Sequence, residues 1–274
     1  MVDVVVIFPA WTLLVNLYSA RITRLLLRNI GEEPWERLAR SMQFQKAARE
    51  VAEAMVTNLA DVNARSWREA AMKSGKGRKI YEALQREIAT ANLRPALLQI
   101  ARRNAELIQS VPPRIAQQVT QHAQQMVEEG RRPEEIEREL KVIAPRLTRS
   151  HAEFIARTEV SRSESQLTEI RAKNIDIPAY QWQSSEDARV RPSHRNMDKV
   201  IVFWNDPPDP ERLIGLKSNP GKYHAGSTYR CRCLELPLIS LDEVSWPARV
   251  FMNGNIVRMR RAQFAALAGY QRAA

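Results

Sequence analysis

Apolar residues recur every three or four positions through most of the first half of the chain. Between Trp35 and Met72, for example, Val51, Met55 and Leu59 would lie on one face of a helix. Comparable spacing continues in three further stretches, IYEALQREIATANL (80–93), PALLQIARRNAELIQSV (95–111) and RIAQQVTQHAQQMVEEG (114–130). The pattern predicts a helical N-terminal half.

Glycine and proline divide this helical half into separate elements. Turn signals occur in SGKGRK (74–79), at Pro112 and Pro113, and at Gly130. RRPEEIERELKVIAP (131–145) favours a short helix that has Pro133 in its first turn and ends at Pro145. A separate, longer helix is expected over 147–174.

The periodicity changes after Asn174, where bulky and polar residues begin to alternate. IPAYQWQSS (177–185), KVIVFW (199–204) and TYRCRCLELPL (228–238) are typical of strands, and NGN (253–255) predicts a turn between two more short strands before a small helix at 261–271. The fold class expected is therefore α+β. A helical N-terminal half precedes a small α+β module with a short antiparallel sheet, and a basic C-terminal appendage follows.

These patterns predict four segments along the 274 residues. They are an apolar N-terminal arm (1–34), a helical domain (35–147), an α+β module (148–240) and a basic C-terminal tail (241–274). In the arm, Asp3, Pro9 and Asn16 interrupt the apolar run before it reaches the roughly 20 residues of a membrane span. The arm also lacks the basic start of a signal peptide. It is expected to pack on a partner or on the protein's own core.

The chain is basic, with 42 Lys and Arg against 31 Asp and Glu, a net charge of +11 and a pI of about 10. This excess makes a polyanion such as DNA a plausible neighbour. The last 26 residues hold no acid and are expected to contact nucleic acid through five arginines, Arg249, Arg258, Arg260, Arg261 and Arg272. A folded appendage with a charged outer side is the other interpretation. The two cysteines exclude a secreted disulfide framework.

The two cysteines, Cys231 and Cys233, lie two positions apart on a predicted strand and would face the same side. With His194 and His224 they would form an N₂S₂ set suited to Zn²⁺. The alternative is that both cysteines pack as small apolar side chains while the arginines beside them face outward. A cysteine nucleophile is disfavoured because no oxyanion-hole loop accompanies it.

A second polar cluster occurs in SSEDARVRPSHRNMD (184–198). A nuclease could use Asp187, Arg189 and His194 as metal ligand, phosphate contact and general base. The structural alternative is a loop held by Asp–Arg pairing and by capping of backbone amides. Arg157 and Glu159 are also assigned structural roles. Spaced two apart on one helix they reach different partners, and Arg157 is expected to be buried between helix and sheet.

Taken in order, several of these motifs resemble the phage Mu F-like minor head protein family, also described as head morphogenesis proteins. The resemblance covers roughly 120–240 and is strongest over 153–237. It rests on Arg157-Thr158-Glu159, Trp182, Asp187-x-Arg189, Pro192-x-His194, Met197-Asp198, Asp206-Pro207-Pro208 and Cys231-Arg232-Cys233. Some relatives carry cysteine where Arg191 and His194 stand here, and histidine in place of Thr228. The resemblance therefore implies a reduced metal set unless His224 contributes.

The resemblance implies a minor head protein of a tailed phage or prophage rather than an enzyme. Such a protein would dock at the portal or inner capsid and assist head assembly and DNA packaging or ejection. Its partners would be the portal protein, the major capsid protein and packaged double-stranded DNA, with no membrane. It would reside in the phage head at the portal vertex, and in the host cytoplasm during assembly. The rival hypotheses are a nuclease or toxin-like effector that uses Asp187, Arg189 and His194, and a DNA-binding module without a capsid role.

Overall fold

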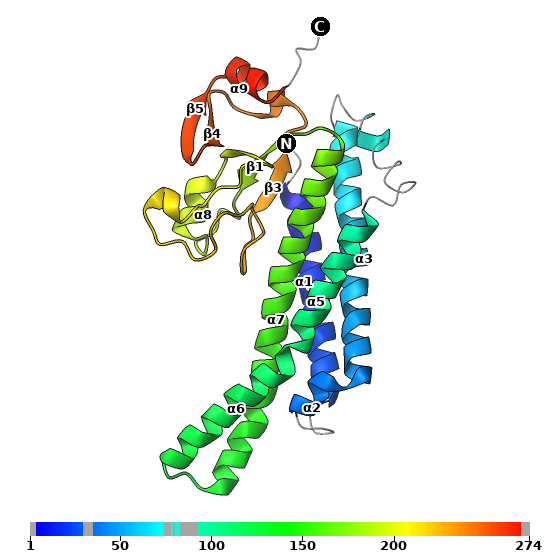
Figure 1. Ribbon diagram of the computed structural model, residues 1–274, viewed down its shortest axis with the longest axis vertical. Coiled ribbons are helices and arrows are strands. Elements are labelled where there is room, and N and C mark those ends of the chain that lie inside the picture. Colours follow the sequence, from blue (N-terminus) through cyan, green and yellow to red (C-terminus); the bar gives the residue numbers. More distant parts are fainter. Residues whose placement is uncertain (1–3, 30–34, 74–77, 79, 83–92, 270–274) are drawn as a thin grey trace. The chain divides into compact units, whose positions relative to one another are not determined.

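The computed structural model describes residues 4–29, 35–73, 78, 80–82 and 93–269 (Figure 1). It is an α+β fold, as expected from the change of periodicity after Asn174. Most of the helix expected over 80–93, and the break before it, lie outside the described residues. The chain forms two compact units. The helical unit comprises 9–59 and 94–160, and the sheet unit comprises 1–8, 60–93 and 161–274.

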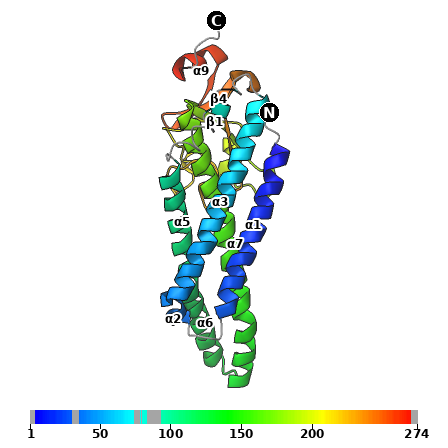
Figure 2. The same cartoon turned by 90° about the vertical axis from the view of Figure 1, so that its right-hand side faces the viewer.

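The helical unit is built from amphipathic helices. They are α1 (Val4–Asn29), α2 (Trp35–Arg40), the first part of α3 (Met42–Lys73), α5 (Arg94–Gln109), α6 (Val111–Glu128) and the first part of α7 (Pro133–Asn174). Helices α1 and α3 lie side by side (Figure 2). Tyr18 joins them, because its hydroxyl donates to the Ala54 carbonyl at 3.0 Å and accepts from the Asn58 amide at 2.8 Å.

Within the predicted N-terminal arm, Val4–Asn29 form helix α1, which packs on the protein's own core. Its most fully buried residues, Val15, Tyr18, Ile22 and Leu26, are spaced three or four apart. That spacing gives the helix one continuous apolar face, and burial of this face holds the helix against its neighbours. Among the helices described, none has both the length and the apolar character needed to cross a membrane.

Helix α7 differs from the sequence expectation, because it runs unbroken through Pro145. The short helix expected to end at Pro145 and the longer one after it are a single element of 42 residues. An interior proline removes one backbone hydrogen bond and costs about 3 kcal/mol. Further along the same helix Ala152, Ile155 and Val160 are buried. Tertiary packing of this kind overrides the local preference to break.

The sheet unit contains five strands, β1 (Ala179–Gln183), β2 (Ile201–Phe203), β3 (Leu234–Pro237), β4 (Ala248–Met252) and β5 (Asn255–Met259). Their spatial order is β3-β1-β2-β4-β5. Three of the pairings are antiparallel, but β2 and β4 run parallel with Ile201 opposite Val250. The sheet is thus mixed, where a purely antiparallel sheet was expected.

Residues 248–259 of the predicted basic tail are part of this sheet rather than an appendage beside it. The expected turn at 253–255 joins β4 to β5, and α9 (Arg261–Leu267) follows. The Asn253 amide donates to the Asp206 carboxylate at 3.0 Å, and the Arg249 guanidinium donates to the Asn196 carbonyl at 2.8 Å. These bonds tie the β4–β5 hairpin to segments some fifty residues earlier in the chain.

Both faces of the sheet are covered, because successive strand residues point to opposite sides. One face carries Tyr180, Trp182 and Val202 and packs against Trp67 of α3 and Ala172 of α7. The other face carries Ala179, Ile201 and Val250 and packs against Phe264 of α9. The first of these two cores also contains both cysteines, so the candidate metal ligands lie inside the sheet unit.

Candidate metal centre

Three of the four predicted metal ligands meet in the buried core of the sheet unit. His194, Cys231 and Cys233 are all less than 5% exposed, and their ligand atoms lie within 4.8 Å of one another. His194 is supplied by the short helix α8 (Pro192–Met197), and the cysteines by the segment that leads into β3. This group could bind a metal ion.

The cysteines do not lie on a strand, although the alternating sequence pattern predicts one. Strand β3 begins only at Leu234. Before it, Arg230 has a positive φ of 51°, and the Cys231 amide donates to the Thr228 carbonyl at 3.2 Å in a turn. The thiols converge on His194 because this turn redirects the chain, and not because alternate strand residues share a face.

A row of small residues on α7 lets the cysteine segment approach closely. The Ser161 hydroxyl donates to the Cys231 carbonyl at 2.8 Å. At Gly226 a Cβ atom would lie 3.2 Å from the Ser161 carbonyl oxygen and 3.3 Å from that of Cys233, and φ there is +77°. A larger residue at either position would push the segment away from the helix. The serine spacing in EVSRSESQ (159–166) is the signal that could have identified this contact surface.

The imidazole of His194 is oriented by a hydrogen-bond chain. Its Nε2 lies 2.9 Å from the Tyr223 hydroxyl, which donates to Glu211 at 2.8 Å. A phenol has one proton, and a carboxylate only accepts, so the Tyr223 oxygen accepts the proton of Nε2. The lone pair of Nδ1 then points at the two sulfurs. Metal-bound histidines use this tautomer, with the second nitrogen held by an oxygen.

The distances within the group suit a tetrahedral ion. Nδ1 of His194 lies 3.4 Å from the sulfur of Cys233 and 3.5 Å from that of Cys231. Typical Zn–S and Zn–N bond lengths with tetrahedral angles place such atoms about 3.5 Å apart. The hydrogen bond between the thiols lowers the pKa of Cys231 and raises that of Cys233. One thiolate is therefore favoured beside the histidine, and thiolates are the form that binds metal.

The fourth predicted ligand, His224, does not join this group. Its Nδ1 lies 3.2 Å from the Tyr180 hydroxyl, and its ring packs edge-on against Tyr180 and Trp204. Burial lowers its pKa, as expected for a neutral imidazole packed among aromatic rings.

Tyr223 and Glu211, which orient His194, were not predicted from the sequence. They lie 29 and 17 residues from His194 in the chain and belong to no local motif.

Asp187 and Arg189, the other members of the candidate nuclease set, contribute to the structure of their own loop. The guanidinium of Arg232 binds both oxygens of Asp187, with Nη2 at 2.8 Å from Oδ1. The Arg189 amide donates to the same carboxylate at 2.9 Å. His194 is 2% exposed, and both of its ring nitrogens have partners. A general base must reach its substrate, so this geometry does not support nuclease chemistry at His194.

The Asp187 pairing predicts a defined loss of stability in acid. Its hydrogen bonds with Arg232 lower the pKa of Asp187 from 3.8 to about 2. Because the folded state holds the proton less tightly than the unfolded chain, this stabilisation is complete above about pH 4 and is lost as the pH falls from about 4 to about 2. In urea unfolding, Asp187→Asn should be less stable than wild type at pH 6, and the difference should shrink below pH 4. Glu186→Gln is the control, and a constant Asp187→Asn difference from pH 6 to pH 2.5 would contradict the assignment.

The Arg-Thr-Glu motif lies on α7 in the helical unit, where its two charged residues do take different partners. Glu159 is 1% exposed and accepts from Nε of Arg103, on α5, at 2.9 Å. Arg157 instead pairs with Glu153 one turn earlier at 2.6 Å and is about two-fifths exposed. The expectation of a buried arginine that joins helix to sheet is therefore wrong for Arg157. In this motif the buried charge is the glutamate.

The five tail arginines are placed unequally. Arg258 and Arg260 are exposed, on β5 and just before α9. Arg261 pairs with Asp242 at 2.6 Å, and the Arg249 guanidinium donates to Asn196. Arg272 lies outside the described residues. Arg258 and Arg260 are thus the two exposed members of the predicted set that form no ion pair with an acidic residue in the described part of the chain.

Comparison with known proteins identifies the region that carries this site. An uncharacterized protein of Haemophilus influenzae is 27% identical over 161 residues, which are 58% of this chain. The chain spans about a third of that relative's length, and no solved structure matches. The family model described as Phage Mu protein F like protein matches residues 117–235, which include α7, α8 and all three ligands. This match confirms the resemblance seen in the motifs, because residues 117–235 are similar to the family described as Phage Mu protein F like protein.

Proposed function

We propose that the protein is a minor component of a phage or prophage head that acts in head morphogenesis. The observation that carries this proposal is the family match over residues 117–235. In this proposal the N-terminal segments, 1–34 and 35–147, provide the surface that docks on the portal or the inner capsid. The α+β module and residues 241–274 lie toward packaged DNA and assist its packaging or ejection. The protein acts in the virion after assembly in the host cytoplasm.

Quantitative mass spectrometry of purified particles tests this proposal. The ratios of this protein to the portal and major capsid subunits are the quantities to measure. A few copies per particle, in a fixed ratio to the portal protein, are expected of a minor head protein. Absence from washed particles would overturn the proposal. A copy number that follows the major capsid protein instead would place the protein on the shell and contradict portal docking.

The buried His194, Cys231 and Cys233 group is proposed to hold a structural Zn²⁺ ion. Zinc is favoured because it binds thiolate and imidazole ligands well, whereas Mg²⁺ prefers oxygen ligands. When bound, the ion would link α8 to the segment that precedes β3. The site is enclosed, since its three ligands and Trp182 are buried and the Trp182 ring lies edge-on to His194 with centroids 5.6 Å apart. This surrounding supports a structural rather than a catalytic role.

DNA contact through the exposed tail arginines predicts a measurable change in salt dependence. Each phosphate contact makes the slope of log K against log salt more negative by roughly 0.9 for duplex DNA. The double variant Arg258→Gln/Arg260→Gln should therefore give the full chain a shallower slope, by up to about 2. The matched control Arg78→Gln/Arg102→Gln removes two exposed arginines that pair with glutamates in their own helices. Equal slopes for the two double variants would count against DNA contact at Arg258 and Arg260.

A further inference from the structure

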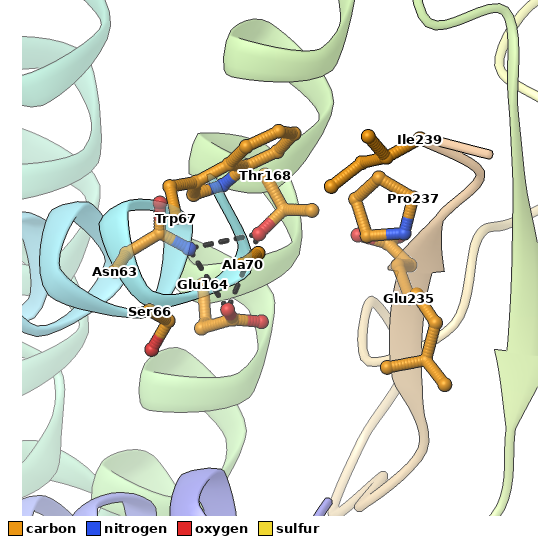
Figure 3. Close-up of a pocket in the computed structure, with 10 residues that line it drawn as sticks. Asn63, Ser66, Trp67, Ala70, Glu164, Thr168, Glu235, Pro237 and Ile239 are labelled. Carbon is orange, nitrogen blue, oxygen red and sulfur yellow. Dashed lines mark hydrogen bonds between the residues drawn. The ribbon is translucent and has the colours of Figure 1, made fainter. Parts of the chain in front are cut away.

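A small cavity lies in the sheet unit, between α3, α7 and strand β3. Its volume is about 40 Å³. Figure 3 shows Asn63, Trp67 and Thr168 on the helical side and Pro237 and Ile239 on the strand side. The walls are largely apolar, formed by Trp67 and Ala70 of α3 together with Pro237 and Ile239. The cavity is separate from the candidate metal centre, whose ligands are not among its lining residues.

Two carboxylates line this cavity, together with the polar side chains of Asn63, Ser66 and Thr168. Glu164 is held from one side, because the Asn63 amide donates to its Oε1 at 2.9 Å and to the Thr168 hydroxyl at 2.8 Å (Figure 3). The guanidinium of Arg171 donates to the side-chain oxygen of Asn63 and so orients that amide. Glu164 is thus fixed in position by a network that spans α3 and α7.

Glu235 supplies the second carboxylate and is incompletely satisfied. It is 6% exposed, and its Oε1 accepts from the Ser165 hydroxyl at 2.7 Å. Its Oε2 is buried and has no hydrogen-bond partner among the described residues. The unpartnered Oε2 leaves an acceptor for a donor group bound in the cavity.

We propose that this cavity binds a primary ammonium group carried on a short, unbranched alkyl chain. An ammonium has three donors and no acceptor, and it would donate to Oε2 of Glu235 in a cavity that also contains the Glu164 carboxylate. Its methylene groups would lie against Trp67, Pro237 and Ile239, as the stems of lysine side chains do on apolar surfaces. Ca²⁺ and Mg²⁺ fit less well, because they require six or more oxygen ligands or their own bound waters. The inference does not depend on the proposed role in phage heads.

Titration of the full-length protein with n-butylamine tests this proposal. Calorimetry should show one site per chain, and the midpoint of thermal unfolding should rise with amine concentration. The neutral isostere n-butanol and MgCl₂ at equal concentration should give no comparable shift. Nα-acetyl-lysine methylamide carries the same ammonium on a peptide backbone. Binding of either amine supports the site, and tighter binding of the lysine derivative would assign the group to a protein side chain rather than to a free amine.

Variants test whether the amine occupies this cavity. Glu235→Gln removes the charge at nearly constant shape and should weaken butylamine binding by about tenfold or more. Ala70→Val narrows the cavity while both carboxylates remain, and this variant should also weaken butylamine binding. Glu243→Gln, an exposed carboxylate outside the cavity, is the matched control and should bind as wild type does. The proposal is overturned if neither amine binds wild type, or if folded Glu235→Gln and Ala70→Val both bind with unchanged affinity.

Discussion

Replacement of Cys233 by serine is expected to abolish stoichiometric zinc binding by this protein. Full-length protein that has been stripped with a chelator and then supplied with Zn²⁺ should retain one ion per chain after gel filtration. Free zinc at 100 times the dissociation constant would raise the free energy of unfolding by about 2.7 kcal/mol. Cys231→Ser and His194→Ala should lose the ion in the same way, because the group offers three ligand atoms. Elemental analysis and thermal unfolding measure both effects.

Two further variants distinguish the metal ligands from the residues around them. Tyr223→Phe removes the oxygen that holds Nε2 of His194, and loss of such a partner typically weakens metal affinity by about 10–100-fold. His224→Gln should bind zinc as wild type does, since His224 lies outside the ligand group. Wild-type protein that retains no zinc would contradict the proposal. So would a Cys233→Ser variant that binds as tightly as wild type, because the two thiols would then be packing residues.

Replacement of Arg103 by methionine should produce the largest loss of stability in the helical unit, about 3 kcal/mol. Arg103 is the cation that lies 2.9 Å from the carboxylate of Glu159, whose side chain is 2% exposed. Methionine fills a similar volume but removes this cation from beside a buried carboxylate. Removing one partner of a buried ion pair costs more than the pair itself contributes. Chemical denaturation with a helical probe measures the change.

The neighbouring residue provides the control. Arg102→Met removes an arginine whose partner, Glu106, is on the surface of the same helix, and it should change the free energy of unfolding by less than about 0.5 kcal/mol. The double variant Arg103→Met/Glu159→Leu should recover most of the lost stability, because it removes both charges together. Equal effects of Arg103→Met and Arg102→Met would show that Glu159 does not depend on Arg103.

The helices and the α+β class followed from local periodicity. The spacing of Val51, Met55 and Leu59 predicted one face of a helix, and the structure buries Met55 and Leu59 on α3. The strands β1 and β2 likewise lie where bulky residues alternate or β-branched residues cluster. These features were predictable because side-chain direction in a helix or strand depends only on position along that element.

Other features depended on contacts between distant parts of the chain. Helix α7 continues through Pro145 although proline is a strong local breaker. The parallel pairing of β2 with β4 joins residues about fifty positions apart, for which no local pattern exists. The same holds for the C-terminal hairpin, whose basic composition suggested a separate appendage. Its place in the sheet is stabilised by hydrogen bonds that Asp206 and Asn196 accept from the hairpin.

By itself, the sequence determined the residue types of the metal centre, since it offered Cys231, Cys233, His194 and His224 as candidate ligands. Only the tertiary structure decided which histidine joins the thiols. His194 and His224 are both near aromatic residues, but a turn at Arg230 and the chain from Glu211 through Tyr223 bring His194 alone to the sulfurs. Hydrogen-bond partners 12 to 39 residues apart are selected by packing in three dimensions, which periodicity along the chain does not encode.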